Sequence, residues 1–567
     1  MSRLVKKCPS VCTDLPLSNA DVCGKLRLMM ELLRSCYGPT ARLKQVHNNI
    51  GGFVVTTSTS SVLLPAITSS HPLINVVKLS LLSHVQRFSD CGLFAAILCL
   101  SLVEQAKLSG VREHAVIRVN NHLLAMCISY LQQDGCSCKV SLDFCRSQNL
   151  ITLARSVISS KPACVLTELE SLHISRLAVH AFLLTVPCSI PGTVSLGKIV
   201  TVTIKGHSVL ESAVFTGLLV DVPEDIFFDT KDSFSAPLLM VLFSASLAGD
   251  LCEVGEGVIQ THPRLDTASQ ILDQLLELGK QVVKDEVRVF VCQKVIHPVL
   301  QRFLRCHGVF VIERLGAALM EPLTQMTGAQ PVATLHSTPP AVAYGKIRHL
   351  SVKQFGPKKF LHLQPFEEST VCTMVLCHRN ETMLNELKVV SQKTEHVLRL
   401  TLREPSALLG GGCTETHLAA YIRHKCKNEA SETATGLGCS QTEYLLAVEG
   451  FCHSLEFVAS SLEHDGGISV SDLTHAHNWT FPPDILEEQM DGSVGFCGCG
   501  VVGSSPSTKW TFLKTEHPDF PPVPVVRDTP VQPSVLDSFA AKLSAFQVAV
   551  ETANLALDVR YVIQDVN

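Results

Sequence analysis

The stretch GGGCTETHLA at residues 410–419 is a glycine turn that runs into a helical pattern. Three consecutive glycines allow positive φ values and a close backbone approach that Cβ atoms forbid. The N–H groups at the start of the following helix would suit an anion, because the helix dipole favours negative charge there. Tight packing without a ligand also produces such a turn. The stretch therefore predicts a phosphate or nucleotide pocket only if other segments supply the remaining groups.

The composition is that of a folded globular protein, with 46% hydrophobic and 17% charged residues. A length of 567 residues gives roughly three to four domains. The net charge is -5, and the 47 Lys and Arg are interspersed with 52 Asp and Glu. No basic run is dense enough to neutralise several phosphates, so we expect no nucleic-acid partner.

No apolar run accompanies Lys6 and Lys7, and the longest runs, near 92–103 and 236–243, fall short of the roughly 20 residues that span a bilayer. We therefore expect a cytoplasmic, cytosolic protein without a membrane span. The 23 cysteines are then expected to be reduced core thiols. The pairs Cys136/Cys138 and Cys497/Cys499 lack a second pair at zinc-finger spacing, and a structural metal is the less favoured alternative.

The order of patterns predicts an α+β multidomain protein. Helical periodicity occurs near both ends of the chain, and short β-prone runs alternate with helical runs between about 197 and 364. This arrangement predicts one domain completed by both ends around a central α/β insertion. The expected elements are helices at 19–36, 72–82, 92–108, 271–283 and 542–563 and strands at 53–55, 200–204, 238–243, 287–292 and 309–312. Residues 492–533, rich in Pro and Gly, are expected to be irregular.

Several motifs, in this order, resemble those of group II chaperonin subunits of the thermosome and CCT type. They are LRSCYGP at 33–39, HP at 71–72, SDCG at 89–92 in place of G-D-G-T-T, VCQK at 291–294, TGA at 327–329, GGGCTE at 410–415, DGG at 465–467 in place of N-A-G, and the final helix. The resemblance implies a helical equatorial domain (1–138 and 401–567), a small α/β intermediate domain (139–212 and 365–400) and an α/β apical domain (213–364).

Residues 88–94 and 411–417 resemble, within that family, the vertebrate Bardet-Biedl chaperonin-like proteins. This resemblance implies assembly of BBSome subunits, as clients, together with CCT subunits and other Bardet-Biedl chaperonin-like proteins, in support of cilium biogenesis. It also implies a place at the centrosome or basal body, with the nucleus as a further location. Residues 46–57 resemble the family's intersubunit hairpin. We expect a monomer or a partner of other chaperonins, with a homo-oligomeric ring as the alternative.

ATP hydrolysis needs Mg²⁺ on oxygen ligands and a carboxylate that orients water. Asp90 stands where the resemblance places a metal-ligating Asp. Ser58 stands where the family's I-T-N-D-G-A-T has its Asp, and Lys393, seventeen residues before Gly410, replaces the second catalytic Asp. We therefore predict no catalytic residue and little hydrolysis.

Two alternatives remain: the pocket binds ATP, with Mg²⁺ at Asp90, or it is empty and collapsed. The residues expected to contact a nucleotide are Gly38, Asp90, Gly410, Gly411, Gly412 and Asp465. A weaker alternative is the loop with Gly192, Gly197 and Lys198, which resembles a P-loop but lacks the final Ser or Thr and a following helix. A chance turn is favoured there.

Two functions remain. The favoured one is a chaperonin-like assembly factor, without ATP hydrolysis, that holds a client through apolar apical residues at 238–240 and 272–283. The alternative is an ATP-driven folding chaperone, which would need the missing acids.

Overall fold

The computed structural model describes residues 11–38, 41–47, 54–69, 71–133, 136, 138–187, 196–221, 237–249, 267–333, 339–356, 358–462, 468–472, 477–481, 496–497 and 535–564. The chain forms two compact units: unit 1 is Met1–Val179 with Asn385–Asn567, and unit 2 is His180–Leu384. Both ends of the chain thus belong to unit 1. The division into equatorial, intermediate and apical domains at the boundaries given above stays a prediction.

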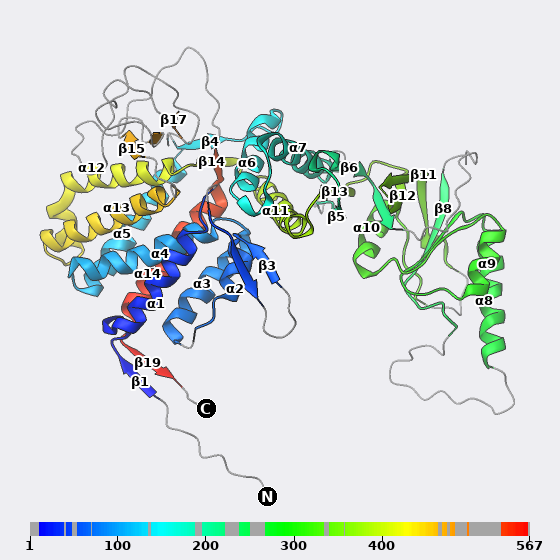
Figure 1. Ribbon diagram of the computed structural model, residues 1–567, viewed down its shortest axis with the longest axis horizontal. Helices are drawn as coiled ribbons and strands as arrows, with labels where there is room; N and C mark the ends of the chain where they lie inside the picture. Colours follow the sequence, from blue (N-terminus) through cyan, green and yellow to red (C-terminus); the bar gives the residue numbers. More distant parts are fainter. Residues whose placement is uncertain are drawn as a thin grey trace, which may run out of the picture. The chain divides into compact units, whose positions relative to one another are not determined.

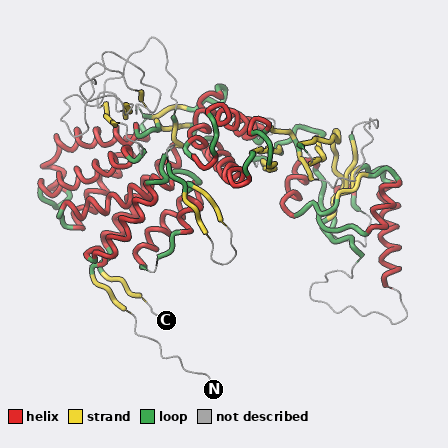
Figure 2. Tube along the Cα trace, in the orientation of Figure 1, coloured by secondary structure: helices red, strands yellow, loops and turns green. Residues whose placement is uncertain are grey.

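Unit 1 is mainly helical (Figure 2). Its helices are α1 (Ala20–Arg34), α2 (Ser60–Ala66), α3 (Pro72–Phe88), α4 (Gly92–Ser109), α5 (Glu113–Gln132), α6 (Ser147–Ser159), α12 (Cys413–Gly436), α13 (Gln441–Ser460) and α14 (Phe539–Asp558). Two more, α7 (Glu168–Leu184) and α11 (Glu381–Leu400), run across the boundaries at which the chain passes between the units. The predicted start of α1 is confirmed, because the side chain of Asn19 accepts a hydrogen bond from Asp21 N at 2.8 Å.

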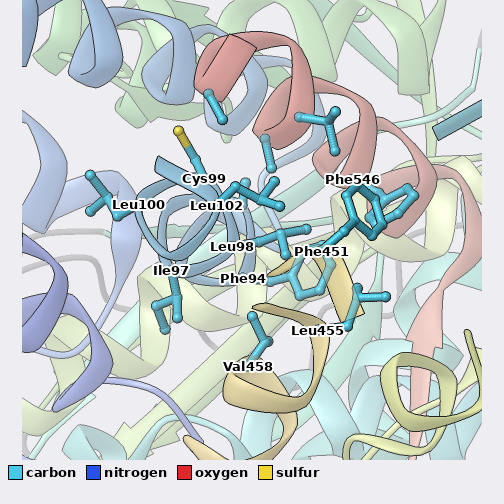
Figure 3. Close-up of a cluster of buried hydrophobic side chains, with 14 of the residues drawn as sticks. Phe94, Ile97, Leu98, Cys99, Leu100, Leu102, Phe451, Leu455, Val458 and Phe546 are labelled. Atoms are coloured by element: carbon cyan, nitrogen blue, oxygen red, sulfur yellow. The ribbon is translucent and has the colours of Figure 1, made fainter. Parts of the chain in front are cut away.

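Helix α4 is the centre of unit 1. Figure 3 shows its side chains meeting Phe451, Leu455 and Val458 of α13 and Phe546 of α14. Residues 92–103 of α4 are buried on every side of the helix, which identifies it as a core helix. By length and composition α4 would also pass as a membrane span, but 72% of it is buried inside the protein.

Short strands complete unit 1. They are β1 (Val11–Asp14), β2 (Lys44–His47), β3 (Val54–Thr57), β4 (Lys139–Ser141), β14 (Ser406–Leu409), β15 (Ile468–Asp472), β16 (His477–Phe481), β17 (Phe496–Cys497), β18 (Leu536–Ser538) and β19 (Tyr561–Gln564). The order β18-β14-β4 forms one antiparallel sheet, and β2 pairs with β3 as predicted for a hairpin. Apart from β17, the stretch at 492–533 lies outside the described residues.

The predicted final helix is too long. The observed helix, α14, ends at Asp558 instead of residue 563. Strand β19 follows it and pairs antiparallel with β1 at the other end of the chain (Figure 1). Tyr561, Val562 and Ile563 favour strands, and β1 supplies the partner that a lone strand needs. Helical periodicity in one segment cannot reveal a partner almost 550 residues away in the sequence.

Unit 2 is an α/β structure with a six-stranded sheet in the order β10-β9-β8-β11-β12-β7 and a three-stranded sheet in the order β5-β13-β6. Its strands are β5 (Ile199–Lys205), β6 (Ala213–Thr216), β7 (Leu218–Asp221), β8 (Leu238–Phe243), β9 (Val289–Cys292), β10 (Phe310–Ile312), β11 (Tyr344–Phe355), β12 (Lys358–Pro365) and β13 (Cys372–His378). Helices α8 (Thr267–Lys284) and α9 (Pro298–Cys306) lie on one face of the larger sheet, and α10 (Ala317–Thr327) lies on the other (Figure 1).

The predicted client-binding residues are part of this core. Alternate side chains of β8 enter the two apolar clusters on either face, and Leu238 and Met240 are buried. Leu275, Leu278 and Val282 of α8 are also buried, against the sheet. The expectation that these segments hold a client directly is therefore wrong for their buried side chains. The sequence could not show this, because a strand covered on both faces has the same apolar run as a strand with an exposed apolar face.

The predicted α+β multidomain class is confirmed by the two units. Cysteines of the described ranges form no disulfide, and most of them are buried. The Cys136 thiol is hydrogen-bonded with Cys138, which lowers the pKa of Cys136 to about 7. Among the described residues, no group of three or more His, Cys, Asp or Glu is placed to hold a metal.

Candidate functional site

The glycine turn at 410–412 joins β14 to α12 in unit 1. Gly411 and Gly412 have φ values of 67° and 84°, and Gly412 is the N-cap residue of α12. A Cβ at Gly410 would lie 2.7 Å from Val535 Cγ1. The turn therefore combines the two properties expected of it, a positive φ and a close approach.

A second turn, Ser89-Asp90-Cys91, joins α3 to α4. Ser89 and Cys91 adopt φ values of 59° and 57°, which are left-handed although neither residue is glycine. His84 holds the turn, since its Nε2 donates to the Asp90 carbonyl at 2.9 Å, and burial lowers the pKa of His84. The surrounding structure thus keeps a glycine-like backbone without glycine.

Both turns reach one cavity of about 270 Å³ in unit 1. The cavity brings together five of the predicted residues: Gly38, Asp90, Gly411, Gly412 and Lys393. Gly410 is next to the lining but packs against Val535 instead. Asp465 lies outside the described residues, so its predicted contact stays a prediction.

The floor of the cavity holds a lysine that the sequence reasoning missed. Lys542 of α14 is buried and forms ion pairs with Glu415 of α12 and, at 2.9 Å, with Asp537 of β18. Its Nζ lies 4.0 Å from the centroid of the Phe94 ring. Burial alone would lower the pKa of Lys542, but Asp537 and Glu415 raise it well above its usual value. Lys542 is therefore a cation at neutral pH.

A different lysine lies on another wall. Lys393 of α11 is 8% exposed and has no hydrogen bond or ion pair with a residue of the described ranges. Burial lowers the pKa of Lys393 to about 7, and Lys161, which lines the same cavity, acts in the same direction. The carboxylates of Asp90 and Glu386 act in the opposite direction. Lys161 follows α6 and was also missed, because nothing in its local sequence marks it as part of a pocket.

Ser58 lies between β3 and α2, is completely buried, and is not part of the cavity lining. Its Oγ has no hydrogen-bond partner among the described residues. The hydroxyls of Thr57 and Thr59 donate to Oε1 of buried Glu386 at 2.9 and 2.8 Å. Glu386 of α11 is a buried acid that the sequence analysis did not single out.

These residues do not fit Mg²⁺. The ion is bound through oxygen ligands that include one or two carboxylates. The carboxylates of the lining are Asp90 and Asp537, and Asp537 is already paired with Lys542. Lys393 lines the same space, and its protonated form would repel a divalent cation.

The P-loop-like alternative lies in unit 2. Gly192 is outside the described residues. Gly197 packs so closely on Thr370 that a Cβ would lie 1.8 Å from its carbonyl oxygen, and Lys198 pairs with Glu321 at 2.7 Å. Strand β5 follows directly, whereas a P-loop opens a helix. A packed turn accounts for these residues.

The family is decided by comparison with known proteins. Residues 29–567 match the model of the TCP-1/cpn60 chaperonin family. The chain belongs to this family. It is 44% identical, over the whole length of both chains, to the protein named Molecular chaperone MKKS of Homo sapiens, and 43% identical to that of Mus musculus.

A thermosome subunit alpha of Saccharolobus solfataricus is 24% identical over 80% of each chain. The predicted resemblance to chaperonins is therefore confirmed, and the full-length identity to Molecular chaperone MKKS places a chaperonin-like protein among the relatives. The protein is chaperonin-like, and membership of a chaperone family implies contact with client proteins.

Proposed function

We propose that this chaperonin-like protein is an assembly factor that binds clients and hydrolyses little or no ATP. The observation that carries the proposal is that the buried side chain of Lys393 lines the cavity, where hydrolysis would need a carboxylate. Loss of one positioned base costs on the order of 100- to 10,000-fold in rate. Ser58 supports the proposal, since its hydroxyl cannot replace a carboxylate as a base.

The proposed clients are BBSome subunits, assembled together with CCT and other Bardet-Biedl chaperonin-like proteins in support of cilium biogenesis. The proposed location is the cytosol, including the centrosome or basal body. The support is the likeness of residues 88–94 and 411–417 to those proteins and the full-length identity to human Molecular chaperone MKKS.

The client surface is proposed to lie on unit 2, on the outer face of α9. The apolar side of α9 packs inward through Leu300 and Leu304. Its exposed side carries Arg302 and Arg305, so this face would hold a client through charge and hydrogen bonds rather than through an apolar patch.

The first test is steady-state phosphate release from the purified protein with ATP and Mg²⁺. We expect the wild type and Asp90→Ala to release phosphate at the same background rate. A rate that Asp90→Ala abolishes would instead favour the alternative, an ATP-driven folding chaperone.

The second test is co-precipitation of BBSome subunits and CCT. The double variant Arg302→Glu/Arg305→Glu should reduce recovery at least fivefold, because charge reversal at an interface adds repulsion to the lost contact. Lys284→Glu, an exposed charge reversal on the adjacent α8, is the matched control. Full recovery with the double variant would reject the α9 surface, and loss of recovery with folded Asp90→Ala would show that the cavity serves client binding.

A further inference from the structure

Another cavity of unit 1, of about 280 Å³, lies between α1 and α4, away from the glycine turn. Its floor is apolar and consists of four buried side chains, Leu26 and Met30 of α1 and Leu100 and Val103 of α4. Its rim is polar and includes a thiol and an amine, those of Cys23 and Lys107. A cavity of this kind suits an apolar chain that carries a reactive polar group at one end.

The thiol and the amine are in contact. Lys107 Nζ donates a hydrogen bond to Cys23 Sγ at 3.0 Å. Both groups also donate to the carbonyl oxygen of Leu17, Cys23 Sγ at 2.9 Å, and this shared acceptor holds the nitrogen beside the sulfur. Lys107 is exposed and Cys23 is half-buried, so a reagent in solution can reach both.

The charges of the rim favour a nucleophilic sulfur. Arg27 is paired with Glu104 at 2.7 Å, so the charged group that touches the thiol is Lys107. The thiolate is the nucleophilic form of cysteine, and an ammonium that donates to the sulfur stabilises the negative charge as it forms. Cys12 and Cys145 are exposed too, but they do not line this cavity.

We propose that Cys23 and Lys107 form an acylation site, at which Cys23 takes an acyl group from a thioester and passes it to Lys107 while the acyl chain lies on the apolar floor. In the first step Cys23 Sγ attacks the carbonyl carbon of the thioester. A new bond from carbon to Sγ forms, the bond to the departing sulfur breaks, and the proton of the Cys23 thiol leaves with the departing thiol.

The second step moves the acyl group from sulfur to nitrogen. The ammonium of Lys107 first releases one proton to water, and the uncharged Nζ then attacks the acyl carbon. An amide C–N bond replaces the C–S bond, and the second nitrogen proton passes to Cys23 Sγ, which restores the thiol. Neither step oxidises or reduces any group, and a separation of 3.0 Å between nitrogen and sulfur places the amine close to the carbon that it attacks.

The test is incubation of the full-length protein with the octanoyl thioester of N-acetylcysteamine, followed by hydroxylamine, which cleaves thioesters and leaves amides, and by peptide mass spectrometry. We expect the amide to form on Lys107 at least about tenfold faster than on Lys25, an exposed lysine of α1, because transfer from Cys23 occurs within one molecule. Cys23→Ser should remove this advantage, and Cys145→Ser, at an exposed cysteine outside the cavity, should keep it. Lys107→Arg should leave the octanoyl group on Cys23, where hydroxylamine removes it.

The apolar floor is tested by the length of the acyl chain. The acetyl thioester of N-acetylcysteamine should label Lys107 severalfold more slowly than the octanoyl thioester, because acetyl is too short to leave water on the floor. Leu108→Asn, at the exposed edge of the lining, should slow octanoyl transfer and leave acetyl transfer unchanged. Equal rates for the two thioesters would reject the floor as an acyl site.

Two further outcomes overturn the proposal: labelling of Lys107 in the wild type at the rate of Lys25, or labelling of Lys107 in Cys23→Ser at the wild-type rate. Circular dichroism of each variant shows that it is folded. Client recovery and phosphate release are measured separately, so failure of this proposal leaves the proposed function standing.

Discussion

The two sides of the cavity in unit 1 differ in how their charges and turns are satisfied. On the α12 and α14 side, Lys542 is paired with two carboxylates, and glycines occupy the positive-φ positions of the turn. On the α4 and α11 side, Lys393 is buried without a partner in the described ranges, and Ser89 and Cys91 occupy the positive-φ positions.

This difference shows that one backbone framework can tolerate two kinds of chemistry. Packing fixes the path of both turns, whatever the residue type, because the helices that follow them are buried in the same core. A residue that does not suit its position then lowers the stability of the folded protein, either through backbone strain or through a buried charge without an ion-pair partner. The sides should therefore respond in opposite directions to substitution.

The largest effect on stability is expected on the α12 and α14 side, where the charges are paired. Lys542→Met leaves Glu415, 2% exposed, and Asp537 without their counter-charge. Breaking a buried ion pair in this way costs about 3–5 kcal/mol of unfolding free energy. Urea unfolding followed by circular dichroism measures it.

The control for this variant is Lys542→Met with Glu415→Gln. It removes one of the stranded charges and should recover part of the loss. A loss below about 1 kcal/mol in the single variant would mean that the ion pairs contribute little.

On the other side, Lys393→Met should stabilise the protein, and more so at low pH. The pKa of Lys393 falls from its ordinary 10.5 to about 7, because burial disfavours the charged form. Between these values the unfolded chain binds a proton that the folded protein does not, so wild-type stability rises with pH across this window. Below it the whole penalty is present.

The advantage of Lys393→Met should therefore shrink by about 2–3 kcal/mol between about pH 7 and pH 9, since each pKa unit corresponds to about 1.4 kcal/mol. Urea unfolding at both pH values measures it, with Lys388→Met as the matched control on the same helix. An advantage that is constant with pH would show that Lys393 is not buried as a cation.

Much of the framework around the cavity follows from the sequence. Pro72 after His71 marks the start of α3, and the apolar run from 92 marks α4, because both signals are local. Residue type alone predicts the glycine turn at 410–412. The spacing of seventeen residues between Lys393 and Gly410 predicts that Lys393 belongs to the same pocket, and Lys393 does line that cavity.

The rest depends on contacts that a local pattern cannot contain. Glu415, one partner of Lys542, comes from α12, more than 120 residues earlier in the chain, and Glu386 reaches the loop of Ser58 from another helix. The apolar strand at 238–243 was placed correctly, but only the helices packed on both faces show that it is not a client surface.

The smallest effect concerns the two turns. Ser89→Gly should stabilise the protein by about 0.5–1 kcal/mol, because the left-handed conformation costs a residue with a Cβ about 1–2 kcal/mol and part of the gain is lost to the greater freedom of unfolded glycine. Gly412→Ala, with φ at 84°, should lose about 1–2 kcal/mol for the same steric reason. Thermal unfolding of the pair of variants in one buffer compares the two directions. If both substitutions destabilised the protein, the hydroxyl of Ser89 rather than its backbone would be holding the turn, and the contrast between the two sides would reduce to the two lysines.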